Sequence, residues 1–279
     1  MSAPTNVFDI GPFGWPSDLT PSADIRPAEW LQDPMRWKSW GAGEMALPGR
    51  VIPLGYSHYL RINHPAWKSV TGPGTPWYEA EAVDRRVPWK EVAAWAGLSL
   101  DNITFFTDIV PNTSMIPASA PFTSPPVGLS PQLIHLLTPV LAALTTTPDS
   151  TWVSFWDGGF WEDTSIPDTM DDRARPDYSW RQQQRQRLLR TIKSVPQWAP
   201  PGWAPGGRTY WMAHGPVGAV YDVARGIYQV EPNFWWPDDH AWCLSTEIDF
   251  DFTLIGTNED GAKQLLAIPT LEIYPIEAE

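Results

Sequence analysis

The chain has 279 residues, of which 43% are hydrophobic and 18% are charged, so it is long enough to bury a sizeable core and too apolar to be disordered. Its formal net charge of −13 argues against a general nucleic-acid binder, because neutralising phosphates needs clustered Lys and Arg. A single cysteine excludes an internal disulfide and a multi-cysteine metal site. The 18 Trp residues indicate a large aromatic core or a surface with aromatic anchors, and the 31 Pro residues indicate long irregular connections.

The N-terminal sequence has neither the cationic region nor the apolar region of a secretory signal. The chain also lacks a run of 18 apolar residues, the minimum for a membrane-spanning helix. We therefore expect a cytoplasmic protein that has no membrane partner and no nucleic-acid partner.

Residues 1–48 are predicted to form an irregular arm rich in Pro and Trp. Prolines break every candidate helix there, while scattered Phe and Trp side chains supply apolar anchors. Such a segment usually wraps over a core that other residues form. Residues 49–279 are expected to form a single α+β domain, which begins with a strand in residues 51–62.

Helix and strand signals then follow one another along the first half of this domain. A short helix is predicted at residues 88–96, with Gly97 just past its end, and residues 101–109 are compatible with a strand. Ser130 and Pro131 form a good helix start, and the run 133–144 is apolar nearly all round, so we expect a buried helix there that Pro139 kinks or splits. Residues 152–156 are predicted to be a strand.

Residues 160–208 differ in character and are predicted to be an insertion with a basic helix at residues 180–195. Ser179 can cap this helix, and Arg and Lys populate most of its surface. Three interpretations remain open for it. The helix could lie across an acidic face of the same molecule, bind an external acidic partner, or form a solvated face over the core, and an acidic patch of a second copy would give a homo-oligomer.

The remaining sequence alternates between strand and helix patterns. Strands are predicted at residues 209–213, 241–252 and 271–276, and helices at residues 217–223 and 259–267, the second of which Asn258 can cap. Strands interleaved with short helices indicate an α+β fold, with a mixed or mostly antiparallel sheet and short helices packed on one of its faces.

The most informative segment is residues 234–252, where polar and apolar side chains alternate from Thr246 onward. In a strand this period of two separates the side chains onto two faces. Three carboxylates on one face repel one another, so they need water, cations or a basic partner. We expect the acidic face to consist of Glu247, Asp249 and Asp251, and the apolar face of Ile248, Phe250 and Phe252.

The function that this pattern favours is a non-enzymatic binding protein of immunity or regulatory type. Aromatic anchors beside the acidic strand would bind a basic protein partner. The candidate binding residues are Trp235, Trp236, Asp238, Asp239, His240, Glu247, Asp249 and Asp251.

Other interpretations of this segment remain open. The acidic residues can simply form the solvent-exposed face of a sheet. A metal-dependent hydrolase would use Asp238, His240 and Glu247, and a Cys–His pair would use Cys243, although an apolar setting predicts that this thiol is inert. No catalytic motif or cofactor fingerprint is present, so we expect no cofactor and no resident metal and do not favour an enzyme.

Several stretches resemble a family of uncharacterised proteins of high-GC Gram-positive actinobacteria. They are residues 51–67, 87–100, 152–158, 214–220 and 233–256, of which the last is the most specific because it joins a WPDD turn, an AWC strand and an acidic–apolar alternation. The resemblance implies no established activity. It does imply that the N-terminal arm and residues 160–207 are the variable parts.

Overall fold

A computed structural model of the chain describes residues 18–38, 47–68, 85–100, 105–109, 122–158, 183, 186, 190–191, 193–201, 208–224 and 231–278. Its strands are β1 (Thr20–Pro21), β2 (His58–Asn63), β3 (Ala66–Lys68), β4 (Arg85–Val87), β5 (Phe122–Thr123), β6 (Thr151–Trp156), β7 (Tyr210–Gly215), β8 (Phe234–Pro237), β9 (Trp242–Ser245), β10 (Phe252–Thr257) and β11 (Glu272–Ile276). Its α-helices are α2 (Trp89–Ala96), α3 (Phe106–Ile109), α4 (Pro131–Ala143), α7 (Ala219–Ala224) and α8 (Glu259–Leu266), and two 3₁₀-helices are η1 (Arg26–Gln32) and η2 (Pro34–Arg36).

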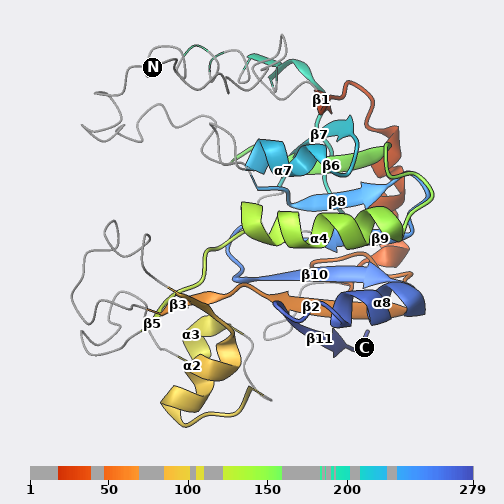
Figure 1. The fold of residues 1–279 in the computed structure, drawn as a ribbon. Helices are drawn as coiled ribbons and strands as arrows, with labels where there is room; N and C mark the ends of the chain where they lie inside the picture. The colour runs from red at the N-terminus through yellow and green to blue at the C-terminus, as the bar shows by residue number, and fades with distance from the viewer. Residues whose placement is uncertain are drawn as a thin grey trace, which may run out of the picture.

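Eight of these strands form one antiparallel sheet in the order β1-β7-β6-β8-β9-β10-β2-β11 (Figure 1). Figure 1 also shows α4, α7 and α8 on one face of this sheet, as the sequence predicts. A second sheet, β4-β3-β5, lies with α2 and α3 beyond one end of β2. The expected α+β fold is therefore confirmed.

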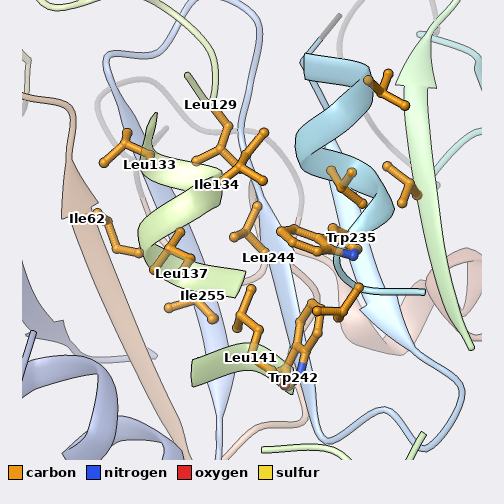
Figure 2. Close-up of a cluster of buried hydrophobic side chains, with 14 of the residues drawn as sticks. Ile62, Leu129, Leu133, Ile134, Leu137, Leu141, Trp235, Trp242, Leu244 and Ile255 are labelled. Atoms are coloured by element: carbon orange, nitrogen blue, oxygen red, sulfur yellow. Dashed lines mark hydrogen bonds between the residues drawn. The ribbon is translucent and has the colours of Figure 1, made fainter. Parts of the chain in front are cut away.

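Side chains alternate between two cores because the main sheet is covered on both faces. The helix-side core lies between the sheet and α4, α7 and α8 (Figure 2), and the arm-side core lies between the sheet and the N-terminal segments. Along β8, for example, Trp235 enters the helix-side core while Phe234 and Trp236 enter the arm-side core. The helix-side core includes Ile62, Leu133, Leu137, Trp235, Trp242, Leu244 and Ile255, and the arm-side core includes Ala28, Leu31, Tyr59, Trp198, Phe234, Trp236, Cys243 and Phe252.

The described part of the N-terminal arm wraps over the sheet, in agreement with the sequence prediction. Thr20 and Pro21 extend the sheet as β1, which pairs with β7. The helices η1 and η2 each have a proline within their first two residues, and η1 buries Ala28 and Leu31 completely. The arm therefore supplies one wall of the arm-side core.

Local signals placed three helix ends correctly. The Ser130 side chain caps α4 by accepting a bond from Leu133 N, and Asn258 caps α8 through Gly261 N. Gly97 ends α2 in the left-handed conformation, with φ of 73°. Pro139 lies inside α4 without splitting it, and this helix buries one stripe of side chains instead of its whole surface, since Leu136 is 37% exposed.

Two predicted strands are wrong. Residues 106–109 form helix α3, and the strand expected at residues 241–252 ends at Ser245 as β9, after which a turn leads to β10, which begins at Phe252. Within the described residues, no helix is long and apolar enough to cross a bilayer.

Leu137→Ala tests the helix-side core. Leu137 is fully buried against the sheet, so its truncation should lower the free energy of unfolding by about 2–5 kcal/mol. Leu136→Ala is the matched control, because its partly exposed neighbour on the same helix should cost less than about 1 kcal/mol. Urea denaturation of both variants measures the difference, and equal losses would contradict the orientation of α4.

Candidate functional site

Trp235 and Trp236 are core residues, so the prediction that they are exposed anchors is wrong. Both have 0% exposure. The physical reason is that β8 is an inner strand of a sheet covered on both faces, where alternate side chains are buried on either side. The Trp235 indole donates to Thr151 Oγ1 at 3.4 Å. A partner cannot contact these two rings in this conformation.

The expected acidic strand is a hairpin turn. Phe250 N donates to Glu247 O at 3.0 Å, and Asp249 N donates to the Glu247 side chain at 2.8 Å, so Glu247 closes the turn with its main chain and its carboxylate. The chain then returns antiparallel, with Leu254 opposite Ser245. The alternation of the sequence therefore does not produce one acidic face.

Glu247, Asp249 and Asp251 occupy three different environments. Glu247 is 3% exposed and forms an ion pair with Arg208, which also contacts the largely exposed Asp249 at 3.2 Å. The Arg208 guanidinium lies 5.4 Å from the ring centroid of Trp156. These contacts make Arg208 the internal counter-ion of the β9–β10 turn. The sequence did not predict this role, because Arg208 follows a stretch rich in Pro and Gly and lies far from the turn in the sequence.

Asp251 faces a separate region, toward α3. It is 9% exposed, and its Oδ2 accepts the Phe106 N–H at 2.9 Å, which ties residues 105–109 to the sheet. Its Oδ1 has no hydrogen-bond partner among the described residues. Burial raises the pKa of Asp251 to about 6, against the opposing pull of the Phe106 N–H and of the Arg61 charge.

The turn between β8 and β9 gathers the remaining candidates. His240 N donates to Pro237 O at 3.0 Å, which closes a tight turn over Asp238 and Asp239. All three turn residues, 238–240, are exposed. His240 adopts φ of 53°, the left-handed conformation that side chains other than glycine rarely take.

Asp239 fastens this turn to the segment after α4. Its carboxylate accepts from Thr145 Oγ1 at 2.7 Å, from Thr146 N at 2.6 Å, from Thr146 Oγ1 at 2.7 Å and from Ala241 N at 3.1 Å. Partial burial alone would raise the pKa of Asp239, but the bonds from Thr146 and Thr145 outweigh it and hold the pKa below its usual value. The carboxylate is thus held in a fixed position.

Asp238 belongs to a polar group that the sequence did not predict. Its carboxylate accepts bonds from Ser150 Oγ and from Trp152 Nε1, and Ser150 Oγ lies 2.8 Å from His214 Nε2. The His214 ring also lies against the Trp152 ring, with centroids 4.4 Å apart. Ser150, Trp152 and His214 are each partly exposed, so the group forms part of the surface.

This Ser–His–Asp group differs from a catalytic triad in the direction of its hydrogen bonds. A carboxylate can only accept, so the single Ser150 proton points to Asp238. Ser150 then accepts from His214, which must carry a proton on Nε2. In a triad the aspartate orients the histidine and the histidine takes the serine proton. The observed arrangement orients a carboxylate instead.

The turn also contacts the N-terminal arm. The His240 ring stacks on Trp30, with centroids 4.4 Å apart and planes at 28°. The Arg36 guanidinium lies 5.4 Å from the Trp30 ring centroid. Burial and the Arg36 charge lower the pKa of His240, while Asp238 and Asp239 act in the opposite direction.

The proposed hydrolase residues do not meet. Asp238 and His240 precede β9 while Glu247 follows it, so the two turns lie at opposite ends of a strand that spans about 13 Å. That grouping is wrong. Among the described residues, no three His, Cys, Asp or Glu side chains gather as a metal site would require.

Two other titratable side chains, those of Cys243 and His64, are buried. Cys243 is fully buried in the arm-side core, and burial raises its pKa, as expected of an inert thiol. His64 is fully buried too, with its Nε2 2.9 Å from Thr253 Oγ1 and its Nδ1 3.0 Å from Pro126 O, and burial lowers its pKa to about 4. Both side chains therefore support the fold instead of facing a ligand.

Most of the predicted basic helix, residues 180–195, lies outside the described residues. The described positions 183, 186, 190–191 and 193–194 are helical and mostly exposed. Its pairing with an acidic partner or a second copy stays a prediction. No family model, curated protein or solved structure matches the chain, so the resemblance to the actinobacterial family also stays a prediction.

The burial of Asp251 predicts a specific pH dependence. Its pKa is about 6 in the folded state against 3.8 as the ordinary value, so the folded chain binds the proton first as pH falls. The wild type should therefore gain stability relative to Asp251→Asn between pH 6 and pH 4, by up to about 3 kcal/mol. Urea denaturation at pH 7, 5.5 and 4.5 measures the difference. His64 titrates in both chains and cancels, and parallel profiles would contradict the raised pKa.

Proposed function

We propose that the chain is a non-enzymatic binding protein whose contact surface is the turn between β8 and β9. Asp238 and Asp239 would face a basic segment of a protein partner, and the rings of Trp152, His214 and Trp30 would flank it. This retains the acidic–aromatic surface expected from the sequence but replaces Trp235 and Trp236 with rings that are partly exposed.

The observation that carries the proposal is the fixed position of two exposed carboxylates beside aromatic rings. Each Asp238 oxygen accepts one bond from the protein, and a carboxylate has about four acceptor positions, so capacity remains for a cation. A Lys or Arg side chain can also lie over an indole face. Since the carboxylates are already held in place, a ligand would lose little additional entropy on ordering them.

The charge of the whole chain favours the same class of partner. A net charge of −13 attracts a cationic segment from a distance and speeds its association. The carboxylates at the other end of β9 are a less suitable site for a cationic partner, because Glu247 and Asp249 already contact Arg208. This difference between the two turns makes the proposal testable.

A fluorescein-labelled nonapeptide of arginine is a suitable probe, read by fluorescence anisotropy at 50 and 150 mM salt. Asp238→Asn/Asp239→Asn should weaken binding about tenfold, because two charge contacts of about 0.7 kcal/mol each are removed. Asp249→Asn/Asp260→Asn is the control, since it raises the net charge equally, from −13 to −11. It should weaken binding less than about twofold.

Equal weakening by both pairs would show that the probe follows net charge alone and would contradict the assigned surface. Circular dichroism and thermal midpoints of each variant establish that the turn substitutions leave the fold intact. A nonapeptide of glutamate should not bind any of the proteins.

A further inference from the structure

Residues 20–38 of the N-terminal arm cross the face of the sheet opposite α4, and main-chain bonds fix both ends. At the start, β1 pairs with β7 and Ser22 N donates to Met212 O at 2.8 Å. At the end, Lys38 N donates to Gly49 O at 2.7 Å. We call these residues the strap.

Trp30 holds the middle of the strap against the sheet. Its ring stacks on His240 at 4.4 Å and meets the rings of Trp236 at 6.1 Å and Tyr56 at 6.5 Å. It therefore joins the strap to the β8–β9 turn, to β8 itself and to the loop before β2. We call the Trp30–His240 stack the latch of the strap.

The packing around Trp30 leaves polar atoms unsatisfied. Among the described residues, the indole nitrogens of Trp30 and Trp236 and the hydroxyl of Tyr56 are buried with no hydrogen-bond partner. Other buried indoles are bonded, since Trp242 donates to Leu141 O at 2.9 Å and Trp235 donates to Thr151 Oγ1. Buried polar groups in native proteins are nearly always bonded, so three exceptions on neighbouring rings mark this interface.

His240 adds backbone strain at the same place. Its φ of 53° is a conformation that glycine or asparagine normally supplies at this position of a hairpin. The surrounding contacts must hold a non-glycine residue there. Strain and unsatisfied donors therefore coincide where the strap meets the sheet.

We propose that the middle of the strap, between its two bonded ends, opens as a unit while the sheet stays folded, and that the Trp30–His240 latch controls this opening. Opening returns water to the two indole nitrogens and the hydroxyl, and their hydration offsets part of the cost of exposing apolar side chains. It uncovers the aromatic face that contains Trp236 and Cys243. The inference does not depend on the proposed basic partner.

Cys243 provides an internal reporter of this opening. It is the single cysteine of the chain, it has 0% exposure, and it belongs to the arm-side core, which the strap covers together with Val51, Ile52 and Tyr56. A thiol reagent such as 5,5′-dithiobis(2-nitrobenzoic acid) can therefore react with it only after the cover opens. The labelling rate of the full-length chain should depend on urea much less steeply than global unfolding does.

Two variants weaken the latch. Trp30→Ala should speed labelling about tenfold or more, and His240→Gly about threefold to tenfold, which is the range for the removal of one stacked aromatic pair. Glycine also suits the φ of residue 240, so the second variant keeps the hairpin intact. Leu137→Ala is the control, because it destabilises the opposite face and should leave the labelling rate in the absence of urea unchanged.

The proposal is overturned if labelling has the urea dependence of global unfolding, or if the rates of all three variants follow their global stabilities. Unchanged rates in both latch variants would overturn it as well.

Discussion

Burial of the β8–β9 strands on both faces is the constraint on which the rest of the structure depends. Trp235, Trp242 and Leu244 need the helices on one side, while Phe234, Trp236 and Cys243 need the N-terminal segments on the other. Fully burying one such side chain contributes about 1.5–3 kcal/mol. An irregular arm that carries Trp30 and Trp37 is therefore part of the fold and not an appendage to it.

Two-sided coverage also dictates where polar side chains can be buried. Thr246 lies against Thr253 at 2.6 Å where β9 and β10 separate, and Thr253 in turn contacts the imidazole of His64. His64 donates through Nδ1 to a carbonyl, so its Nε2 must accept the Thr253 proton, and Thr253 must accept the Thr246 proton. This chain of bonds satisfies three buried groups and holds the turn that carries Glu247.

Local chemistry explains what could be predicted from the sequence. A cap such as Ser130 or Asn258 acts on a backbone N–H three residues away, so its effect is readable without knowledge of the fold. The β9–β10 turn is different, because its sequence continues the alternation of the strands beside it. The strand ends because the Glu247 side chain bonds within the turn and also forms an ion pair with Arg208. Arg208 lies 39 residues earlier in the sequence. The burial of Trp235 and Trp236 likewise depends on layers supplied by distant segments.

The two acidic turns at the ends of β9 differ in what bonds to their carboxylates. At the β9–β10 turn, Arg208 neutralises the carboxylates, so the negative charge is used internally. At the β8–β9 turn, the described residues that bond to Asp238 and Asp239 are all neutral donors, namely hydroxyls, an indole and backbone N–H groups. Neutral donors orient a carboxylate without cancelling its charge, which therefore remains directed at the solvent. Because His240 of the same turn stacks on Trp30, a charge that engages this turn from outside acts on the residue that latches the strap.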